Sequence, residues 1–419
     1  MAFSPGVRRK GVLVILAITA AMAISAMVAG MRIQFRWGHN LYDLSLRVNE
    51  IHAIREQLNP IYVWNCSVES SKYRPAERPA LPNEKEAPAQ DPADPRKPVA
   101  YYPPWHTLLM WWYGFATPSQ AGCVLAMVNG LAMFALAMFF RRFPVFRGEE
   151  GVYKAVFAWL LASVFVTYEF VWNLLTGNYA TFAAGCSLLL VYALEKNRDA
   201  LGAVAFSFLL VKPQIAVLFC WPLLFARKWK ILFAAGAVAA AGTMSVAWWL
   251  DESPLALLRQ IREVGLPFMG KTKFGHFFLL GEIFRIPFGR FGDVTATLSC
   301  FATCGILSYL MRNAKEWWLR ILPAAMFFPY WTYSGFYDIP AAWPLFLAIP
   351  LLFFREKPLD CGVAASAVFR IATIGSVAFL FALRNGLVSG ANLSRFLIPA
   401  AGAAAIATIL LQNRRGTPQ

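Results

Sequence analysis

Long apolar runs separated by short polar segments cover most of the chain. Several runs approach the roughly 20 residues that a helix needs to cross a bilayer, and others are shorter. Lys and Arg cluster after every second run, which is typical of loops that stay in the cytoplasm. We therefore expect an all-α polytopic membrane protein with about twelve crossings and both termini in the cytoplasm. The expected crossings are 11–31, 121–140, 152–172, 179–194, 200–211, 215–225, 231–250, 294–311, 318–333, 339–354, 363–383 and 396–411.

This topology divides the chain into five parts. Residues 1–31 hold the first helix, which we expect to remain uncleaved, and 32–100 form a large external loop. Residues 101–250 form a transmembrane core that opens with a short interfacial element. Residues 251–293 form a second external segment, and 294–419 hold the C-terminal transmembrane helices.

The first external loop contains two different segments. Residues 41–58 lack Pro and Gly, and Leu44, Val48 and Ile51 fall near one face, which predicts an amphipathic helix near the membrane surface. Residues 70–98 are rich in Pro, Glu, Lys and Ala. Because that composition cannot form a packed core, we expect a flexible insertion there.

Composition excludes several classes of protein. With 58% hydrophobic and 15% charged residues, the chain has more apolar surface than soluble domains can bury, so a lipid bilayer is its expected surroundings. The formal charge of +16 lies mostly in short clusters between apolar runs, so it indicates topology and not a nucleic-acid partner. The seven cysteines show no metal-ligand spacing, and six lie in apolar runs as small core residues. We expect neither a metal nor a cofactor.

Polar residues that interrupt the apolar runs fall on the external side of this topology. The cytoplasmic side offers no comparable set, so these residues are candidates to border one external cavity. They are Asp43, Tyr102, Pro103, Pro104, Glu169, Gly177, Asn178, Lys212, Gln214, His276, Tyr337 and Asp338.

Two of these candidates, Lys212 and Asp43, carry charges that could bind a phosphate or accept a proton. Lys212 interrupts an apolar run beside Pro213, and a Lys within such a run costs about 2.5–3.5 kcal/mol on insertion scales. It is either a lysine that snorkels from a helix end or the cation that holds a phosphate. Asp43 is either a solvated residue or helix cap, or a base that accepts a proton from a sugar hydroxyl.

Four local motifs follow one another between about residues 40 and 230, and together they carry a resemblance. They are Asp43 followed by Asn59-Pro60-Ile61-Tyr62, Tyr102-Pro103-Pro104 at the start of an apolar helix, Gly177-Asn178 before an apolar run, and Lys212-Pro213-Gln214 at a short hairpin. In this order they resemble the polytopic GT-C glycosyltransferases of glycosyltransferase family 87, the polyprenol-phosphate-mannose-dependent type.

The resemblance implies a GT-C fold and an enzyme of the bacterial inner membrane. Such an enzyme would transfer a hexosyl or pentosyl residue, mannosyl in the type named, from a polyprenyl-phosphate donor to a lipid or glycan acceptor on the external side. It would make Asp43 the general base and would place Lys212 and Gln214 at the donor phosphate. The substrate cavity would be bordered by Tyr102, Pro103, Pro104, Asn178, His276, Tyr337 and Asp338.

Two other functions fit the same pattern. A lipid or solute transporter would use Lys212, Glu169 and Asp338 as a translocation path, and formation of a glycosidic product separates it from an enzyme. An O-antigen ligase or polymerase would use a diphosphate-linked donor, so donor competition separates it from a transferase that uses a monophosphate donor.

Overall fold

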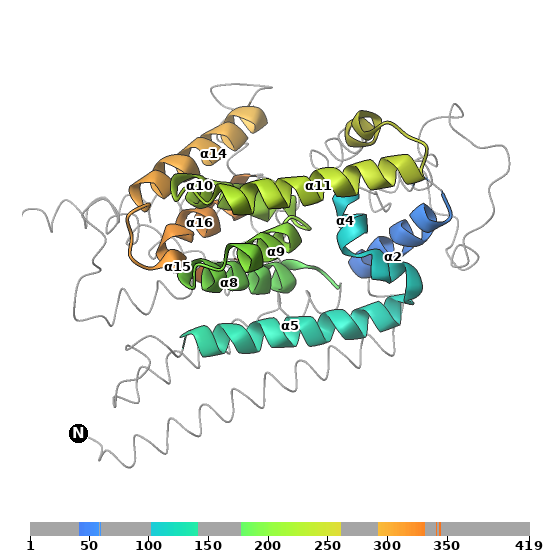
Figure 1. Cartoon of the computed structure of the whole chain (residues 1–419), viewed down its shortest axis with the longest axis horizontal. Helices are drawn as coiled ribbons and strands as arrows, with labels where there is room; N and C mark the ends of the chain where they lie inside the picture. The colour runs from blue at the N-terminus through green and yellow to red at the C-terminus, as the bar shows by residue number, and fades with distance from the viewer. Residues whose placement is uncertain are drawn as a thin grey trace, which may run out of the picture.

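The computed structural model describes residues 42–57, 59, 102–140, 177–260, 292–331, 341 and 343–344. Every regular element in these ranges is helical, as predicted, and Figure 1 shows how the helices are arranged. They are α2 (Tyr42–Arg55), α4 (Pro104–Leu109), the 3-10 helix η2 (Trp111–Phe115), α5 (Pro118–Phe140), α8 (Ala180–Glu195), α9 (Asp199–Leu209), α10 (Pro213–Phe225), α11 (Trp229–Trp249), α14 (Gly292–Leu310), α15 (Trp317–Arg320) and α16 (Leu322–Trp331).

Helix positions agree closely with the apolar runs. The runs at 121–140, 179–194, 200–211, 215–225 and 231–250 correspond to α5, α8, α9, α10 and α11, with ends shifted by at most a few residues, and the run at 294–311 corresponds to α14. The run at 318–333 is two helices, because Pro323 has no amide hydrogen to continue the hydrogen-bond ladder from α15 into α16. The runs at 11–31, 152–172, 363–383 and 396–411, and most of 339–354, lie outside the described residues, so the number of crossings stays a prediction.

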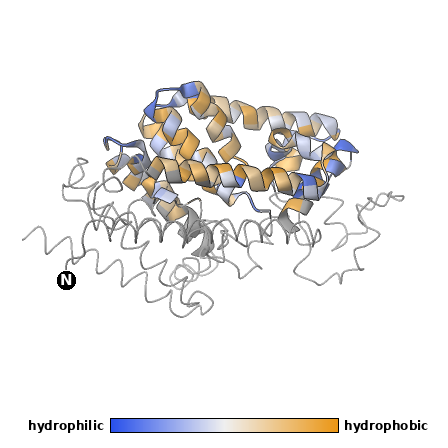
Figure 2. Ribbon diagram, turned by 90° about the horizontal axis from the view of Figure 1, so that it is seen from below, coloured by the Kyte–Doolittle hydropathy of each residue, from blue (hydrophilic) through white to orange (hydrophobic). Residues whose placement is uncertain are grey.

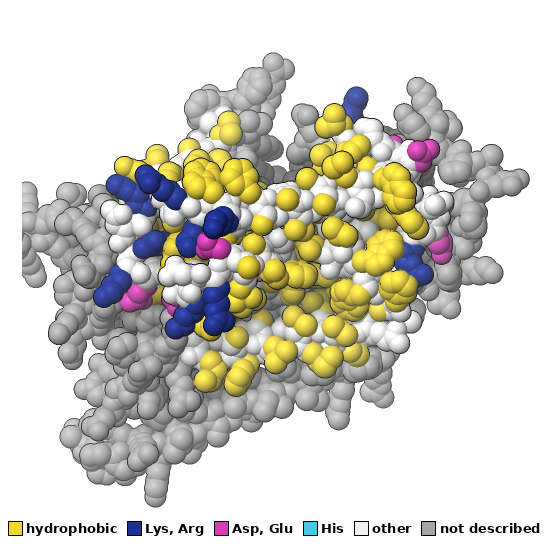
Figure 3. Space-filling model, viewed as in Figure 1, with side chains coloured by type: hydrophobic (Ala, Val, Ile, Leu, Met, Phe, Trp, Pro, Cys, Tyr) yellow, Lys and Arg dark blue, Asp and Glu magenta, His cyan; other side chains and the backbone are white. Residues whose placement is uncertain are grey.

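Among the residues that the structure describes, two helices are long and apolar enough to cross a membrane, namely residues 118–136 of α5 and the whole of α11. Large apolar side chains are exposed along both helices, as Figure 3 shows for one face. They include Met127, Leu131, Phe134, Phe233, Met244 and Trp248. In Figure 2 the helices are hydrophobic along their length, and hydrophilic residues gather at the loops. A core helix of a soluble protein would bury these side chains, so the exposed faces of α5 and α11 suit contact with lipid.

One end of the bundle is basic. Lys228 Nζ donates to Asp199 Oδ1 at 2.9 Å, and this ion pair joins the start of α9 to the loop between α10 and α11. The turn between α8 and α9 and the turn between α10 and α11 therefore lie side by side at this end of the bundle. The neighbouring loops expose Lys196, Arg198 and Arg227, and Figure 3 shows most of the visible Lys and Arg side chains at this end.

The opposite end is uneven, because α9 is much shorter than the helix beside it. Near the basic end Gly202 of α9 packs on Ile231 of α11, where a Cβ on the glycine would lie 2.7 Å from Ile231 Cδ1. The two helices thus start at about the same level, but α9 has 11 residues and α11 has 21. At 1.5 Å of rise per residue, α11 extends about 15 Å farther. The turn that follows α9, which contains Lys212, thus lies partway along α11 and not at its end.

Candidate active site

The short helix α4 lies against the turn at Lys212. Trp105 Nε1 donates a hydrogen bond to the backbone oxygen of Leu210 at 2.9 Å. The other side of the same residue packs on α11, where a Cβ on Gly242 would lie 2.7 Å from Trp105 Cα. Helix α4 thus occupies the step left by the short α9 and connects the Lys212 turn to the second half of α11 (Figure 1).

Lys212 is a buried cation at the start of a helix. It is the N-cap of α10, where its backbone oxygen accepts hydrogen bonds from Ile215 and Ala216 at 2.9 and 3.0 Å. Pro213 follows at the first helical position, where a missing amide hydrogen costs nothing. The lysine is only 1% exposed, which disfavours the interpretation that it snorkels to the surface. A cation at a helix N-terminus opposes the helix dipole, so helix stability does not explain this lysine.

Asp43 is the second residue of α2, the predicted amphipathic helix. The next residue, Leu44, packs directly on Gly177, where a Cβ on the glycine would lie 2.4 Å from Leu44 Cβ. Gly177 has a φ of 68°, in the left-handed region that favours glycine. The Gly177-Asn178 motif therefore lies against the start of the helix that carries Asp43.

A single buried cluster joins three of the four sequence motifs through their neighbouring residues, and Tyr102 of the remaining motif packs against it. Leu44 follows Asp43, Tyr179 follows Asn178, and Val211 precedes Lys212. The full cluster consists of Leu44, Val48, Ile51, Met110, Tyr113, Ala121, Leu125, Tyr179 and Val211. Segments far apart in the chain thus meet at the end of the bundle opposite the basic loops.

The prolines and the asparagine of the predicted site have local structural roles. Pro103 is the N-cap of α4 and Pro104 is its first residue, and both are buried. Asn178 is buried as well, and its side-chain oxygen accepts a hydrogen bond from the amide of Ala180 at 3.0 Å, which forms an Asx turn just before α8. Gln214 is half-buried in the first turn of α10. These contacts place the motifs, and a part in substrate binding remains a prediction.

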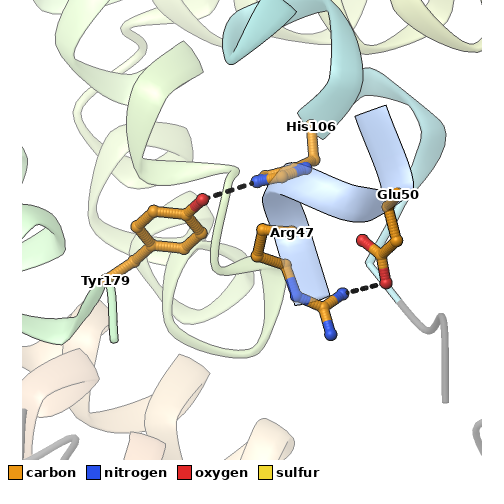
Figure 4. Close-up of polar contacts among 4 residues, drawn as sticks. All are labelled: Arg47, Glu50, His106 and Tyr179. Carbon is orange, nitrogen blue, oxygen red and sulfur yellow. Dashed lines mark hydrogen bonds and ion pairs between the residues drawn. The ribbon is translucent and has the colours of Figure 1, made fainter. Parts of the chain in front are cut away.

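Figure 4 shows a polar group that the sequence did not reveal. Arg47 of α2 is buried and pairs with Glu50, and its guanidinium carbon lies 4.2 Å from the centroid of the Tyr102 ring. His106 Nε2 lies 3.1 Å from the hydroxyl of Tyr179. The one available signal was positional, because Arg47 falls on the same helical face as Leu44 and the other apolar residues of α2.

His106 is a neutral group in this site. It belongs to α4, which is too short to cross a membrane, and it is 1% exposed. Burial, and secondly the positive charge of Arg47, hold the pKa of His106 well below its usual value. A neutral imidazole carries one donor and one acceptor nitrogen, so it forms a hydrogen bond with the Tyr179 hydroxyl in either direction.

The two predicted external segments are tied together at this end. Trp249 Nε1, at the end of α11, donates to the backbone oxygen of Ile54 in α2. Asn59 Nδ2 donates to Gln260 Oε1 at 3.0 Å. Asn59, the first residue of the Asn-Pro-Ile-Tyr motif, therefore lies beside the start of the second predicted external segment.

The structure does not describe four of the residues predicted for the site. Glu169, His276, Tyr337 and Asp338 lie outside the described residues, so their predicted roles stay predictions. Among the residues that the structure describes, no three His, Cys, Asp or Glu side chains gather as metal ligands would.

Comparison with known families identifies the class of this protein. Residues 100–265 match a family of glycosyltransferases, so the protein is an enzyme that transfers a sugar to an acceptor. The family is Glycosyltransferase family 87, which confirms the resemblance carried by the motifs. The matched segment contains Tyr102, Asn178 and Lys212, whereas Asp43 precedes it. Searches of curated proteins and of solved structures found no significant match.

Proposed function

We propose that this glycosyltransferase moves a hexosyl or pentosyl residue, mannosyl in the first instance, from a polyprenyl-phosphate donor to a hydroxyl of a lipid or glycan acceptor. The observation that supports this most is that the neighbours of Asp43 and of Lys212 in sequence belong to one buried cluster. Trp105 holds that turn through Leu210, and Leu44 and Val211 share one buried cluster. The enzyme is a multi-pass protein of the bacterial inner membrane with a GT-C fold.

In the proposed reaction Asp43 acts as the general base. Its carboxylate takes the proton of the acceptor hydroxyl while the acceptor oxygen forms a bond to the anomeric carbon. The bond between that carbon and the phosphate oxygen breaks at the same time, so the configuration inverts. Proton transfer to a well-placed base contributes about 10²–10⁴ in rate. The step uses no metal.

Lys212 stabilises the leaving group. The departing polyprenyl phosphate keeps its negative charge, and an ammonium group beside it replaces the help that a general acid would otherwise give. Because Lys212 is buried, its charge is weakly screened, and an ion pair there is stronger than at the surface. Gln214, two residues later in the first turn of α10, is the second proposed contact to the phosphate.

The orientation across the membrane follows from the two ends of the bundle. The basic loops with Lys196, Arg198 and Arg227 form one end, and the candidate site lies toward the other. Since basic loops stay in the cytoplasm, we infer that the site faces the external side and that both termini are cytoplasmic.

Donor use tests this function directly. The purified protein in vesicles, supplied with radiolabelled polyprenyl-phosphate mannose and a hydroxyl acceptor, should form a glycosidic product and release polyprenyl phosphate. Unlabelled polyprenyl-phosphate mannose should compete, and diphosphate-linked donors should not. Movement of the donor across the vesicle without product would favour a transporter, and product from diphosphate-linked donors alone would favour a ligase or polymerase.

A further inference from the structure

Arg47 links the helix of the proposed base to the segment that carries Tyr102. It is on α2, one helical turn after Asp43, and is 1% exposed. Its guanidinium pairs with Glu50 at 2.5 Å and lies over the face of the Tyr102 ring, with 4.2 Å between its central carbon and the ring centroid. This residue is therefore a contact between α2 and the segment that begins α4.

Stability alone does not account for this ion pair. Removing two charges from water costs about as much as their attraction returns, so a buried pair adds little net stability. The pair also carries no net charge, so it adds no cation to that of Lys212 for binding a phosphate. The pair does fix the orientation of the guanidinium, because Glu50 holds this planar group in place over the face of the Tyr102 ring.

Tyr102 extends this contact to the rest of the site. Its ring lies edge-on to His106, with 4.9 Å between ring centroids, and to Tyr179, with 5.8 Å. His106 and Tyr179 are joined by their hydrogen bond, which ties α4 to the start of α8. The same short helix holds the Lys212 turn through Trp105. A continuous set of contacts thus runs from α2 to the turn.

We propose that Arg47 is a positioning residue, which through Tyr102 holds the helix of Asp43 in a fixed place relative to the Lys212 turn. This inference rests on the proposed function, since it assumes that Asp43 is the base. Asp43 and Lys212 lie on elements far apart in the chain, so their relative placement depends on contacts between those elements, such as this one. A shift of about 1 Å between reacting groups costs on the order of 10²-fold in rate.

The test removes the contact from either side and separates kcat from KM. The double variant Arg47→Met with Glu50→Gln removes both charges of the ion pair together, and Tyr102→Leu removes the ring. Each should lower kcat about 10- to 100-fold with the donor KM changed less than about 3-fold. Combining them should add less than about 3-fold more, because both act through one contact.

Two further variants show that geometry matters and not charge alone. Arg47→Lys keeps the charge but lacks the planar group, so it should remain at least about 5-fold below wild type in kcat. Tyr102→Phe keeps the ring and should exceed Tyr102→Leu about 10-fold in kcat. The control is Arg55→Met, which removes a similar contact from α2, since Arg55 lies 4.3 Å from the centroid of the exposed Phe115 ring. It should leave kcat at the wild-type value.

The outcomes also separate this inference from the proposed function. Additive losses, a raised donor KM with unchanged kcat, or a lowered melting temperature with wild-type kcat would each overturn the positioning role. If Asp43→Asn is inactive while the Arg47 variants keep wild-type kcat, only the positioning role fails. If Asp43→Asn itself keeps full activity, the proposed base is wrong.

Discussion

Gly177 and Leu44 pack so closely that a Cβ on Gly177 would lie 2.4 Å from Leu44 Cβ, closer than real Cβ atoms come to another heavy atom. The glycine also has a φ of 68°, which L side chains rarely adopt. One glycine therefore allows the Asn178 motif to lie against the helix that begins with Asp43. The contact joins two motifs that a long stretch of chain separates.

Gly177→Ala should push α2 away from this turn. The strained backbone alone costs about 1–2 kcal/mol, and the clash with Leu44 adds to it. We expect a lower melting temperature and a transfer rate reduced at least about 10-fold, since the base moves with α2. The control is Gly236→Ala in α11, where no heavy atom lies within 4 Å of the added Cβ. That change should leave the rate unaltered, and equal effects of the two substitutions would contradict the account.

Lys212→Met should weaken donor binding. Methionine fills a similar volume without the charge, so the donor phosphate loses its ion pair and the donor KM should rise about 10- to 100-fold. Free polyprenyl phosphate should also inhibit the variant less than the wild type. Lys196→Met, at the basic end, is the matched control and should change neither value. An unchanged donor KM in the Lys212 variant would show that Lys212 does not bind the donor phosphate.

Tyr179→Phe should destabilise the site without touching the reaction directly. It removes the hydroxyl 3.1 Å from His106 Nε2 and leaves a buried imidazole nitrogen without that partner, at a cost of about 1–3 kcal/mol. The measurement is the thermal midpoint in detergent. Tyr192→Phe, on an exposed position of α8, should leave the midpoint unchanged. Equal midpoints for the two variants would show that the His106 contact contributes nothing.

Cysteine labelling checks the orientation across the membrane. In a Cys66→Ser background, a cysteine introduced in place of Lys196 should react with a membrane-impermeant maleimide only after the membrane is opened. A cysteine in place of Asp251, an exposed residue just past α11, should react in intact cells. The native cysteines Cys186 and Cys304 are buried and should stay unlabelled. Labelling of both introduced cysteines from the outside would contradict the proposed topology.

Sequence alone was informative about where helices lie. Apolar length and proline positions set most boundaries, so Pro118 and Pro213 mark the starts of α5 and α10. It was less informative about a break within one apolar run, because Pro323 is compatible with either a kink or a new helix. Sequence also singled out Lys212, since a charge inside an apolar run is costly unless something compensates it.

The buried polar group around Arg47 could not be predicted from the sequence, for a physical reason. Whether a charged residue such as Arg47 points into the protein depends on partners that the fold supplies. Glu50 is three residues away on the same helix, but Tyr102 comes from a distant segment of the chain. No periodic pattern in the sequence therefore predicts the contact between Arg47 and Tyr102. A lone histidine such as His106 likewise has no spacing pattern that would single it out. That Asp43 and Lys212 work together was predicted from their common external placement and the family resemblance, and it stays a prediction. The structure shows that their neighbours Leu44 and Val211 belong to one buried cluster.

The most direct measurement of the central claim is the single-turnover rate of Asp43→Asn with a polyprenyl-phosphate sugar donor. The matched control is Asp251→Asn, an exposed position with a φ of 52° that asparagine tolerates well. Loss of the general base should lower the rate of Asp43→Asn by about 10²–10⁴, while the melting temperature and donor KM stay near wild type and the control keeps full activity. A wild-type rate in Asp43→Asn would contradict the account.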